Sequence, residues 1–95
     1  MPKTYYVYLM SNDARMLYIG VTNNLERRVL EHRERAVDAY TSRYNLTRLV
    51  HCEPFGDIRE AIAREKELKG WRRSRKIDLV HSTNPRWRDL AKEWG

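Results

Sequence analysis

The stretch from residue 5 to residue 32 constrains the fold of this chain more than any other. Residues 5–10 and 16–21 are two short runs with the period-two pattern of β-strands. The segment between them, Ser-Asn-Asp-Ala-Arg, is rich in residues that favour turns. The stretch therefore predicts a β-hairpin with a loop of about five residues.

A register in which Met10 pairs with Met16 gives the hairpin two distinct faces. It makes these further pairs across the strands: Tyr8 with Tyr18, Tyr6 with Gly20, Val7 with Ile19 and Leu9 with Leu17. Cross-strand neighbours lie about 5 Å apart at Cβ, so two phenols would meet on one face while the other face stays aliphatic. A slip of one residue would scatter the tyrosines over both faces.

An amphipathic helix follows the hairpin directly. Asn23 or Asn24 can cap it, because a short side-chain oxygen satisfies an unpaired backbone N–H. The residues that share one helical face, at i, i+3, i+4 and i+7, are Leu25, Arg28, Val29 and His32. A guanidinium so near the interior needs a partner. We expect either a carboxylate from elsewhere in the chain or an anionic ligand to provide it.

The remaining pattern predicts an α+β domain with elements in the order ββαβαα. Residues 38–45 predict a loop, and residues 46–53 a third strand that ends at Pro54. Asp57 is expected to cap a helix that runs to about residue 71. Beyond it we expect a short helix or strand around Ile77, Leu79 and Val80, then a turn at Asn84-Pro85 that opens a last helical segment.

Glu65 is the exception on the apolar face of the Asp57 helix. That face is formed by Ile58, Ala61, Ile62 and Leu68. Glutamate is rarely buried unless it is paired or coordinates a metal. The alternatives for Glu65 are an ion pair with Arg28 or Lys69 and a metal site at the edge of the sheet.

Composition limits the partners and the location of the protein. The 95 residues contain 19 Lys and Arg against 13 Asp and Glu, a formal charge of +6 that favours nucleic acid as a partner. The single cysteine, Cys52, is expected to be a small core residue in a reducing compartment. We expect no signal peptide and no membrane span, and hence a cytoplasmic protein, with a monomer as the default.

Basic residues are concentrated late in the chain. The candidate nucleic-acid contacts are Arg43, in the 38–45 loop, and Lys69, Arg72, Arg73, Arg75 and Lys76, with Trp71 among them. They could follow a phosphate backbone beside an aromatic platform, or form a solvated surface over a buried Trp71. Tyr40 and Tyr44 could stack on bases or cover the edge of the core, and His51 is expected to lie on a strand face.

The ordered set of motifs resembles the GIY-YIG nuclease domain, in particular its small stand-alone bacterial members. The residues that carry the resemblance are Tyr6-Val7-Tyr8, Tyr18-Ile19-Gly20, Arg28, His32 and Glu65. A single motif of this kind is common, whereas the ordered set at these spacings is specific and covers nearly the whole chain in outline. Tyr6 stands where the family name has its first glycine, a position that we expect to serve packing.

The resemblance implies a small three-stranded antiparallel sheet flanked by helices, which agrees with the order ββαβαα. It also implies one GIY-YIG-like nuclease domain over residues 1–95, with five site residues: Tyr8, Tyr18, Arg28, His32 and Glu65. Glu65 would hold Mg²⁺, with Mn²⁺ as a substitute, because these hard ions take oxygen ligands. Arg28 would bind a phosphate oxygen, the two tyrosines would orient or deprotonate water, and His32 would assist them. A further asparagine contributes in some members of the family, and Asn84 is the conceivable match.

The expected function is a metal-dependent endonuclease that hydrolyses phosphodiester bonds in DNA, structure-selective and acting in repair or recombination. The alternative is a non-catalytic nucleic-acid-binding module on the same scaffold. A third reading is a structural or protein-binding domain. Salt-sensitive binding without metal-dependent cutting would favour the binding module.

Overall fold

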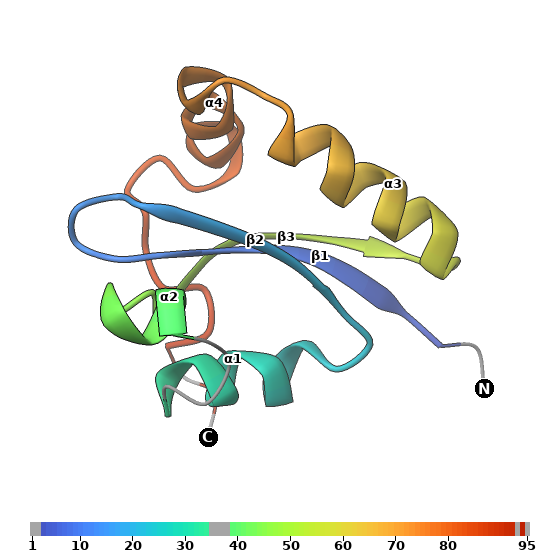
Figure 1. Cartoon of the computed structure of the whole chain (residues 1–95), viewed down its shortest axis with the longest axis horizontal. Helices are drawn as coiled ribbons and strands as arrows, with labels where there is room; N and C mark the ends of the chain where they lie inside the picture. The colour runs from blue at the N-terminus through green and yellow to red at the C-terminus, as the bar shows by residue number, and fades with distance from the viewer. Residues whose placement is uncertain (1–2, 35–38, 93, 95) are drawn as a thin grey trace.

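A computed structural model of the chain describes residues 3–34, 39–92 and 94. The elements, in order, are β1 (Tyr5–Ser11), β2 (Leu17–Thr22), α1 (Leu25–Arg33), α2 (Ala39–Arg43), β3 (Arg48–Phe55), α3 (Ile58–Lys69) and α4 (Arg73–Thr83). The strands form one antiparallel sheet in the order β2-β1-β3 (Figure 1). The expected α+β fold, a three-stranded antiparallel sheet flanked by helices, is confirmed, with one short helix more than the sequence predicted.

The hairpin forms, but the predicted register is wrong by two residues. Tyr8 lies opposite Gly20, and Met10 lies opposite Tyr18. The strands end at Ser11 and resume at Leu17, and the Asn12 side chain organises the loop by accepting a hydrogen bond from the backbone of Met16. A shift of two leaves every side chain on its predicted face, because the period of a strand is two.

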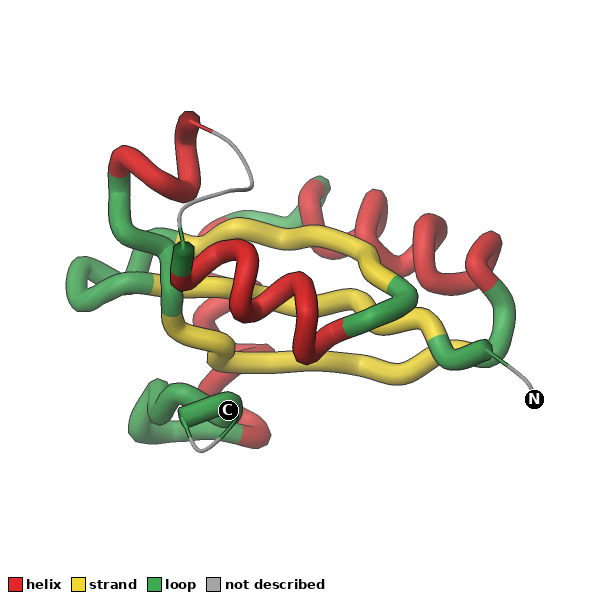
Figure 2. The backbone as a smooth tube through the Cα atoms, turned by 90° about the horizontal axis from the view of Figure 1, so that it is seen from below, coloured by secondary structure: helices red, strands yellow, loops and turns green. Residues whose placement is uncertain are grey.

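The two faces of the sheet pack in two separate cores, as predicted. The aliphatic face packs beneath α3 and α4, with Val7, Leu9, Ile19, Val50, Ala61, Leu68 and Val80 in its core. The tyrosine face packs on α1, with Tyr8, Met10, Leu25, Val29, Leu46 and Leu49 in its core. Figure 2 views the second face and shows α1 in front of the three strands.

The helix caps agree with the sequence predictions. Asn24, not Asn23, caps α1 by accepting a hydrogen bond from the backbone N–H of Arg27, 3.1 Å away. Asp57 caps α3 in the same way through Arg59. Leu25, Val29 and His32 are buried on the inner face of α1, whereas the predicted fraying of that helix at residues 35–38 lies outside the described residues.

Three local predictions are corrected. Residues 39–43, predicted as part of a loop, form the single helical turn α2. The third strand runs from Arg48 to Phe55, two residues later than expected, and includes Pro54, which an edge strand tolerates because one side of its backbone faces away from the ladder. The uncertain segment around Ile77 is helical and belongs to α4.

The segment after Asn84 is irregular and not the predicted last helix. It crosses the β3 edge of the sheet, so Trp87 packs in the core beneath α3 and α4 and Ala91 packs in the core against α1. A helix cannot reach both cores at this spacing, and the backbone of Leu90 instead donates a hydrogen bond to the carbonyl of Leu49. Within the described ranges, no helix combines the length and the apolar character needed to cross a membrane.

Candidate active site

An open cavity of about 430 Å³ lies beside the free edge of β2. The residues that line it are Tyr8, Tyr18, Gly20, Val21, Arg28, Ile58, Ile62 and Glu65. The cavity extends around the sheet edge, with α1 and the tyrosines on one side and α3 on the other. Four of the five residues predicted for the site therefore line one cavity, although the chain separates them by up to 57 positions, from Tyr8 to Glu65.

The two tyrosines are diagonal neighbours on the sheet, and not direct partners as predicted. Their ring centroids lie 6.2 Å apart with the planes at 44°. Tyr8 is buried and occupies the space above Gly20, where a Cβ atom would lie 2.6 Å from the phenol oxygen. Position 20 therefore requires glycine because any larger side chain would collide with the Tyr8 ring. The backbone conformation is not the reason, because the φ angle of Gly20 is not positive.

His32, the fifth predicted residue, lies directly behind the phenols. Its Nε2 atom is 3.1 Å from the hydroxyl of Tyr8, within hydrogen-bond distance. The imidazole also meets the Tyr18 ring edge-on, with centroids 5.2 Å apart. His32 is 1% exposed, so it reaches the cavity through Tyr8 and does not line it.

Burial dominates the acid–base character of Tyr8. It raises the pKa of the phenol well above its ordinary value, and the neighbouring Tyr18 and Glu65 raise it further, while the positive charge of Arg28 lowers it. A phenolate at position 8 is therefore costly. The Tyr8 hydroxyl can therefore take part in proton transfer most easily if it gives its own proton to a neighbour while it accepts a proton from another group.

Arg28 projects from α1 at the mouth of the cavity, with 33% of its side chain exposed. Its Nε atom lies 3.5 Å from Glu31 Oε1, one turn along the helix, but is buried and makes no hydrogen bond with any part of the chain that the structure describes. The predicted carboxylate partner from elsewhere is not found there. This guanidinium retains the capacity to bind an anion such as phosphate.

Glu65 reaches the cavity although α3 packs on the opposite face of the sheet from the tyrosines. Successive residues of a helix are rotated by about 100°, which places Ala61 and Leu68 over the sheet and turns Glu65 about 40° toward the β2 edge. Ile58 and Ile62, predicted as core, are turned the same way, and both are more than a third exposed as walls of the cavity. The sequence periodicity assigned both isoleucines to the core and therefore missed their place in the cavity wall.

The Glu65 carboxylate makes one of its two predicted ion pairs. Its Oε2 atom lies 3.4 Å from Nζ of Lys69, one turn along α3, and the pairing with Arg28 is not formed. The Lys69 side chain is 54% exposed and that of Glu65 20%, and ion pairs near the surface contribute about 0–1 kcal/mol. A competing cation could therefore displace it at little cost.

The donor set suits one kind of metal ion. Glu65 is the single carboxylate that lines the cavity, and within residues 3–34, 39–92 and 94 no three His, Cys, Asp or Glu side chains are grouped to hold a metal. Zinc sites need three or four protein ligands, and the cavity does not fit them. Mg²⁺ keeps several waters and binds through one or two carboxylates together with substrate phosphate, which this arrangement does fit.

The predicted basic residues do not form one continuous site. Lys69 pairs with Glu65, Arg75 lies over the ring of Trp71 with its Cζ 3.9 Å from the centroid, and Arg43 lies over Tyr44 at 5.4 Å. Trp71 is half-buried and packs against the core beneath this cation, while a contact of the basic run with phosphate stays a prediction. Arg72 is exposed before α4, and Arg73 and Lys76 line a separate small cavity.

Other residues singled out by the sequence lie away from the cavity. His51 is buried between Thr83 and Glu53, with ring nitrogens 3.2 Å and 2.8 Å from their oxygens. Cys52 is half-buried beside the tyrosine core, and burial raises the pKa of its thiol. Asn84 is buried and bonded to the backbone of Val50 and Arg88, a structural role.

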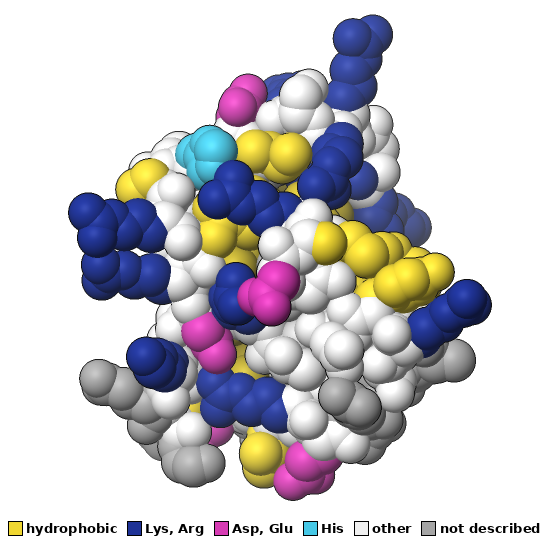
Figure 3. Space-filling model, turned by 90° about the vertical axis from the view of Figure 1, so that its left-hand side faces the viewer, with side chains coloured by type: hydrophobic (Ala, Val, Ile, Leu, Met, Phe, Trp, Pro, Cys, Tyr) yellow, Lys and Arg dark blue, Asp and Glu magenta, His cyan; other side chains and the backbone are white. Residues whose placement is uncertain are grey.

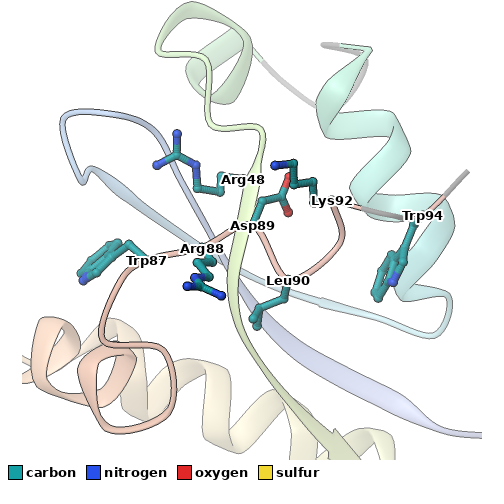
Figure 4. A pocket seen from close by; sticks show the side chains of 7 residues that line it. All are labelled: Arg48, Trp87, Arg88, Asp89, Leu90, Lys92 and Trp94. Carbon is teal, nitrogen blue, oxygen red and sulfur yellow. The ribbon is translucent and has the colours of Figure 1, made fainter.

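A larger cavity, of about 900 Å³, lies at the opposite, β3 edge (Figure 4). Its one carboxylate, Asp89, accepts hydrogen bonds from the backbone of Leu49 and Ala91 and pairs with Arg33. All its oxygens thus serve to fix the segment after α4. This cavity lacks the paired phenols and a carboxylate available for catalysis.

The chain is similar to known proteins of one family. The GIY-YIG catalytic domain family matches residues 4–78. A UPF0213 protein of Clostridium perfringens is 35% identical over 88 residues, which cover 93% of this chain and 95% of that protein. A UPF0213 protein of Natronomonas pharaonis is 40% identical over 80 residues, or 84% and 94% of the two chains.

A solved structure is similar to the whole described fold. The solution NMR structure of a UPF0213 protein from Bacillus halodurans matches with a TM-score of 0.59 and 27% sequence identity. The match covers 96% of this chain and 97% of that one. The family match extends from β1 into α4 and so includes every residue of the candidate site, from Tyr8 to Glu65.

Proposed function

Because the chain belongs to the GIY-YIG catalytic domain family, whose nuclease members act on nucleic acid, we propose that it is a metal-dependent endonuclease that hydrolyses phosphodiester bonds in DNA. The observation that carries this proposal is the cavity at the β2 edge, where two phenols, a guanidinium and a carboxylate meet. We extend the proposal to one domain over residues 1–95, to a monomer, and to a role in DNA repair or recombination.

The guanidinium of Arg28 binds the scissile phosphate in this proposal. Its planar fork donates two hydrogen bonds to the non-bridging oxygens and stabilises the charge that grows there in the transition state. Its position at the cavity mouth, with no hydrogen bond from Nε to the described part of the chain, supports this role. Ile58 and Ile62 form the wall that limits water around the phosphate.

Tyr8 and His32 together accept the proton of the attacking water. The water gives a proton to the Tyr8 oxygen as the phenol proton moves to Nε2 of His32, 3.1 Å away, a step that requires the tautomer with the ring proton on Nδ1. This transfer avoids the phenolate that burial disfavours. The water oxygen forms the new bond to phosphorus, and the bond to the leaving oxygen breaks with its electron pair. Tyr18 orients the water from the adjacent position.

Glu65 is the residue that would hold Mg²⁺ or Mn²⁺, after it releases Lys69. When bound, such an ion supplies Lewis-acid stabilisation of charge on the phosphate and on the leaving oxygen. Arg28 and Glu65 line the same cavity, so the guanidinium would bind the phosphate close to the residue that would hold the ion.

Cleavage assays with matched variants test the proposal. Plasmid, branched and single-stranded DNA are incubated with Mg²⁺ or Mn²⁺ and the wild type, Glu65→Gln or Arg28→Ala. We expect each change to lower the rate by about 10²–10³-fold, whereas the exposed neighbours Glu60→Gln and Arg27→Ala leave it unchanged. Equal cutting by the wild type and Glu65→Gln would reveal a contaminating nuclease and end the proposal.

A second candidate is the non-catalytic nucleic-acid-binding module. The observation that favours it is the thin ligation offered by one carboxylate, already paired with Lys69. It predicts binding that weakens with salt and no cleavage of any of the three DNA forms with either ion. The same assays therefore separate the two candidates.

A further inference from the structure

A second cavity, of about 280 Å³, lies along the same edge of the sheet as the candidate active site. The residues that line it are Met16, Leu17, Tyr40, Arg73 and Lys76. Leu17 is followed directly in β2 by Tyr18, which lines the active-site cavity. Figure 1 shows α1 and α2 on one side of the sheet and α3 and α4 on the other. The active-site cavity is lined from α1 and α3, and the second cavity from α2 and α4.

The lining of this second cavity carries positive charge and no carboxylate. Lys76 is half-buried and forms no ion pair with any described residue. Arg73 is held in place by a hydrogen bond from its Nη2 to the backbone carbonyl of Arg15, 2.7 Å away in the hairpin loop. Figure 3 views the end of the molecule that carries this loop and shows Lys and Arg side chains over much of it. Two cations around one cavity suit a phosphate group.

Tyr40 supplies an aromatic surface on the other side of this cavity. Its side chain is 48% exposed, and its ring packs against that of Tyr44, with centroids 5.0 Å apart at 58°. A ring that is exposed on one side and supported by a neighbour is a suitable platform for a nucleic-acid base. The remaining basic residues of the run are outside this cavity, and Arg75 is placed over Trp71.

We propose that this second cavity binds the DNA strand beside the cleavage site, with a phosphate between Arg73 and Lys76 and a base stacked on Tyr40. This inference rests on the proposed nuclease function and names the path of its substrate, along the β2 edge. Leu17 and Gly20, which line the two cavities, are three residues apart in β2, or about 10 Å at ~3.3 Å per residue. One strand of DNA can therefore contact both cavities.

Binding is tested in the Glu65→Gln background without divalent ions, so that no cleavage occurs. Fluorescence anisotropy with labelled single-stranded and duplex oligonucleotides gives the affinity between about 50 and 200 mM salt. We expect Arg73→Ala with Lys76→Ala to weaken binding at least tenfold and to lower the salt slope by about two, one for each lost phosphate contact. The matched control, Arg72→Ala with Arg75→Ala, removes the same charge from the same region and lowers the affinity much less.

Tyr40 is tested by a readout that does not depend on charge. Tyr40→Ala is expected to weaken single-strand binding about tenfold, within the range measured for base–aromatic stacking, and to leave the salt slope unchanged. Tyr40→Phe keeps the ring and retains the affinity. Loss of affinity in both variants would contradict stacking.

The outcomes separate this inference from the nuclease proposal. If oligonucleotides bind but both double variants lose affinity equally, the basic run acts as a diffuse charge, and the second cavity is not a strand site. If only Arg73 and Lys76 matter but the wild type cuts no DNA, the strand site stands and the nuclease proposal fails. If the Glu65→Gln protein binds no oligonucleotide at low salt, the strand site is overturned, and cleavage by the wild type with Mg²⁺ decides the nuclease proposal by itself.

Discussion

The phenol of Tyr8 occupies the volume that a side chain at Gly20 would need. The two residues face each other across the β1–β2 ladder, and a Cβ atom built at Gly20 would lie 2.6 Å from the Tyr8 oxygen and 2.7 Å from Cζ. The ring cannot swing aside freely, because Tyr8 is 1% exposed and its hydroxyl contacts His32. Backbone and phenol thus define the floor of the candidate active site together.

Gly20→Ala tests this packing. We expect it to lower the free energy of unfolding by about 1–3 kcal/mol, as overpacking does in a tight core, and to reduce cleavage by moving Tyr8. Gly56→Ala is the control, because no atom lies within 4 Å of a Cβ there. Urea denaturation measures both. A Gly20→Ala protein as stable and active as the wild type would show that the tyrosine ring has room to move.

His32→Asn tests the proton transfer through Tyr8. A neutral imidazole can accept the proton and a protonated one cannot, so we expect wild-type cleavage to be lost in acid. We expect the cleavage rate of the variant to be about 10²–10⁴-fold lower than that of the wild type, and to show no such fall at low pH. His81→Asn, at an exposed position, should retain the wild-type rate and its fall at low pH. If cleavage by His32→Asn falls at low pH as cleavage by the wild type does, a group other than His32 accepts the proton.

Tyr8→Phe tests burial of the phenol by its effect on the free energy of unfolding at alkaline pH. Burial raises the pKa of Tyr8 above its ordinary value of 10.0, so the unfolded chain loses this proton first. The stabilisation is therefore complete below about pH 10 and falls above it, by up to about 1.4 kcal/mol per pH unit. Urea denaturation from pH 8 to 11 should show a shallower decline in Tyr8→Phe. The exposed Tyr40→Phe is the control, and it should decline like the wild type; equal slopes in all three would contradict the buried phenol.

Glu53→Gln tests the charged network between β3 and α3. Burial by itself would raise the pKa of Glu53, but hydrogen bonds from Arg64 and His51 outweigh it and hold the pKa below its ordinary value of 4.5. The ionised carboxylate therefore stabilises the fold above that value and ceases to do so as the pH falls below it. We expect the variant to lose about 1–3 kcal/mol at pH 7, with a gap that narrows in acid. The exposed Glu60→Gln serves as the control, and a gap independent of pH would contradict the network.

Asn84→Ala separates a structural asparagine from a catalytic one. The side chain donates to the carbonyls of Val50 and Arg88 and accepts from the backbone of Arg88, at 2.8–3.1 Å. Its removal leaves buried backbone groups unpaired, which costs about 1–3 kcal/mol. The exposed Asn23→Ala should cost little. Calorimetry measures the stability, and cleavage per folded molecule should stay at the wild-type level; a large drop in that rate would assign Asn84 to the reaction.

The sequence by itself determined the elements that depend on local chemistry. The alternation in the hairpin assigned the tyrosines and the aliphatic side chains to opposite faces, and the caps at Asn24 and Asp57 began the helices where expected. Each of these choices depends on residues a few positions apart, so a periodic pattern can reveal it. The same pattern placed Arg28 and His32 on one side of α1.

Only the tertiary structure decided which residues meet. The Asn12 loop set the register that puts Tyr8 over Gly20 and not opposite Tyr18. The rotation of α3 over the sheet turned Glu65 around the β2 edge into the tyrosine cavity. Such contacts depend on loop geometry and on how whole helices and strands pack against each other, because the residues involved are far apart in the chain. A local pattern in the sequence therefore cannot predict them.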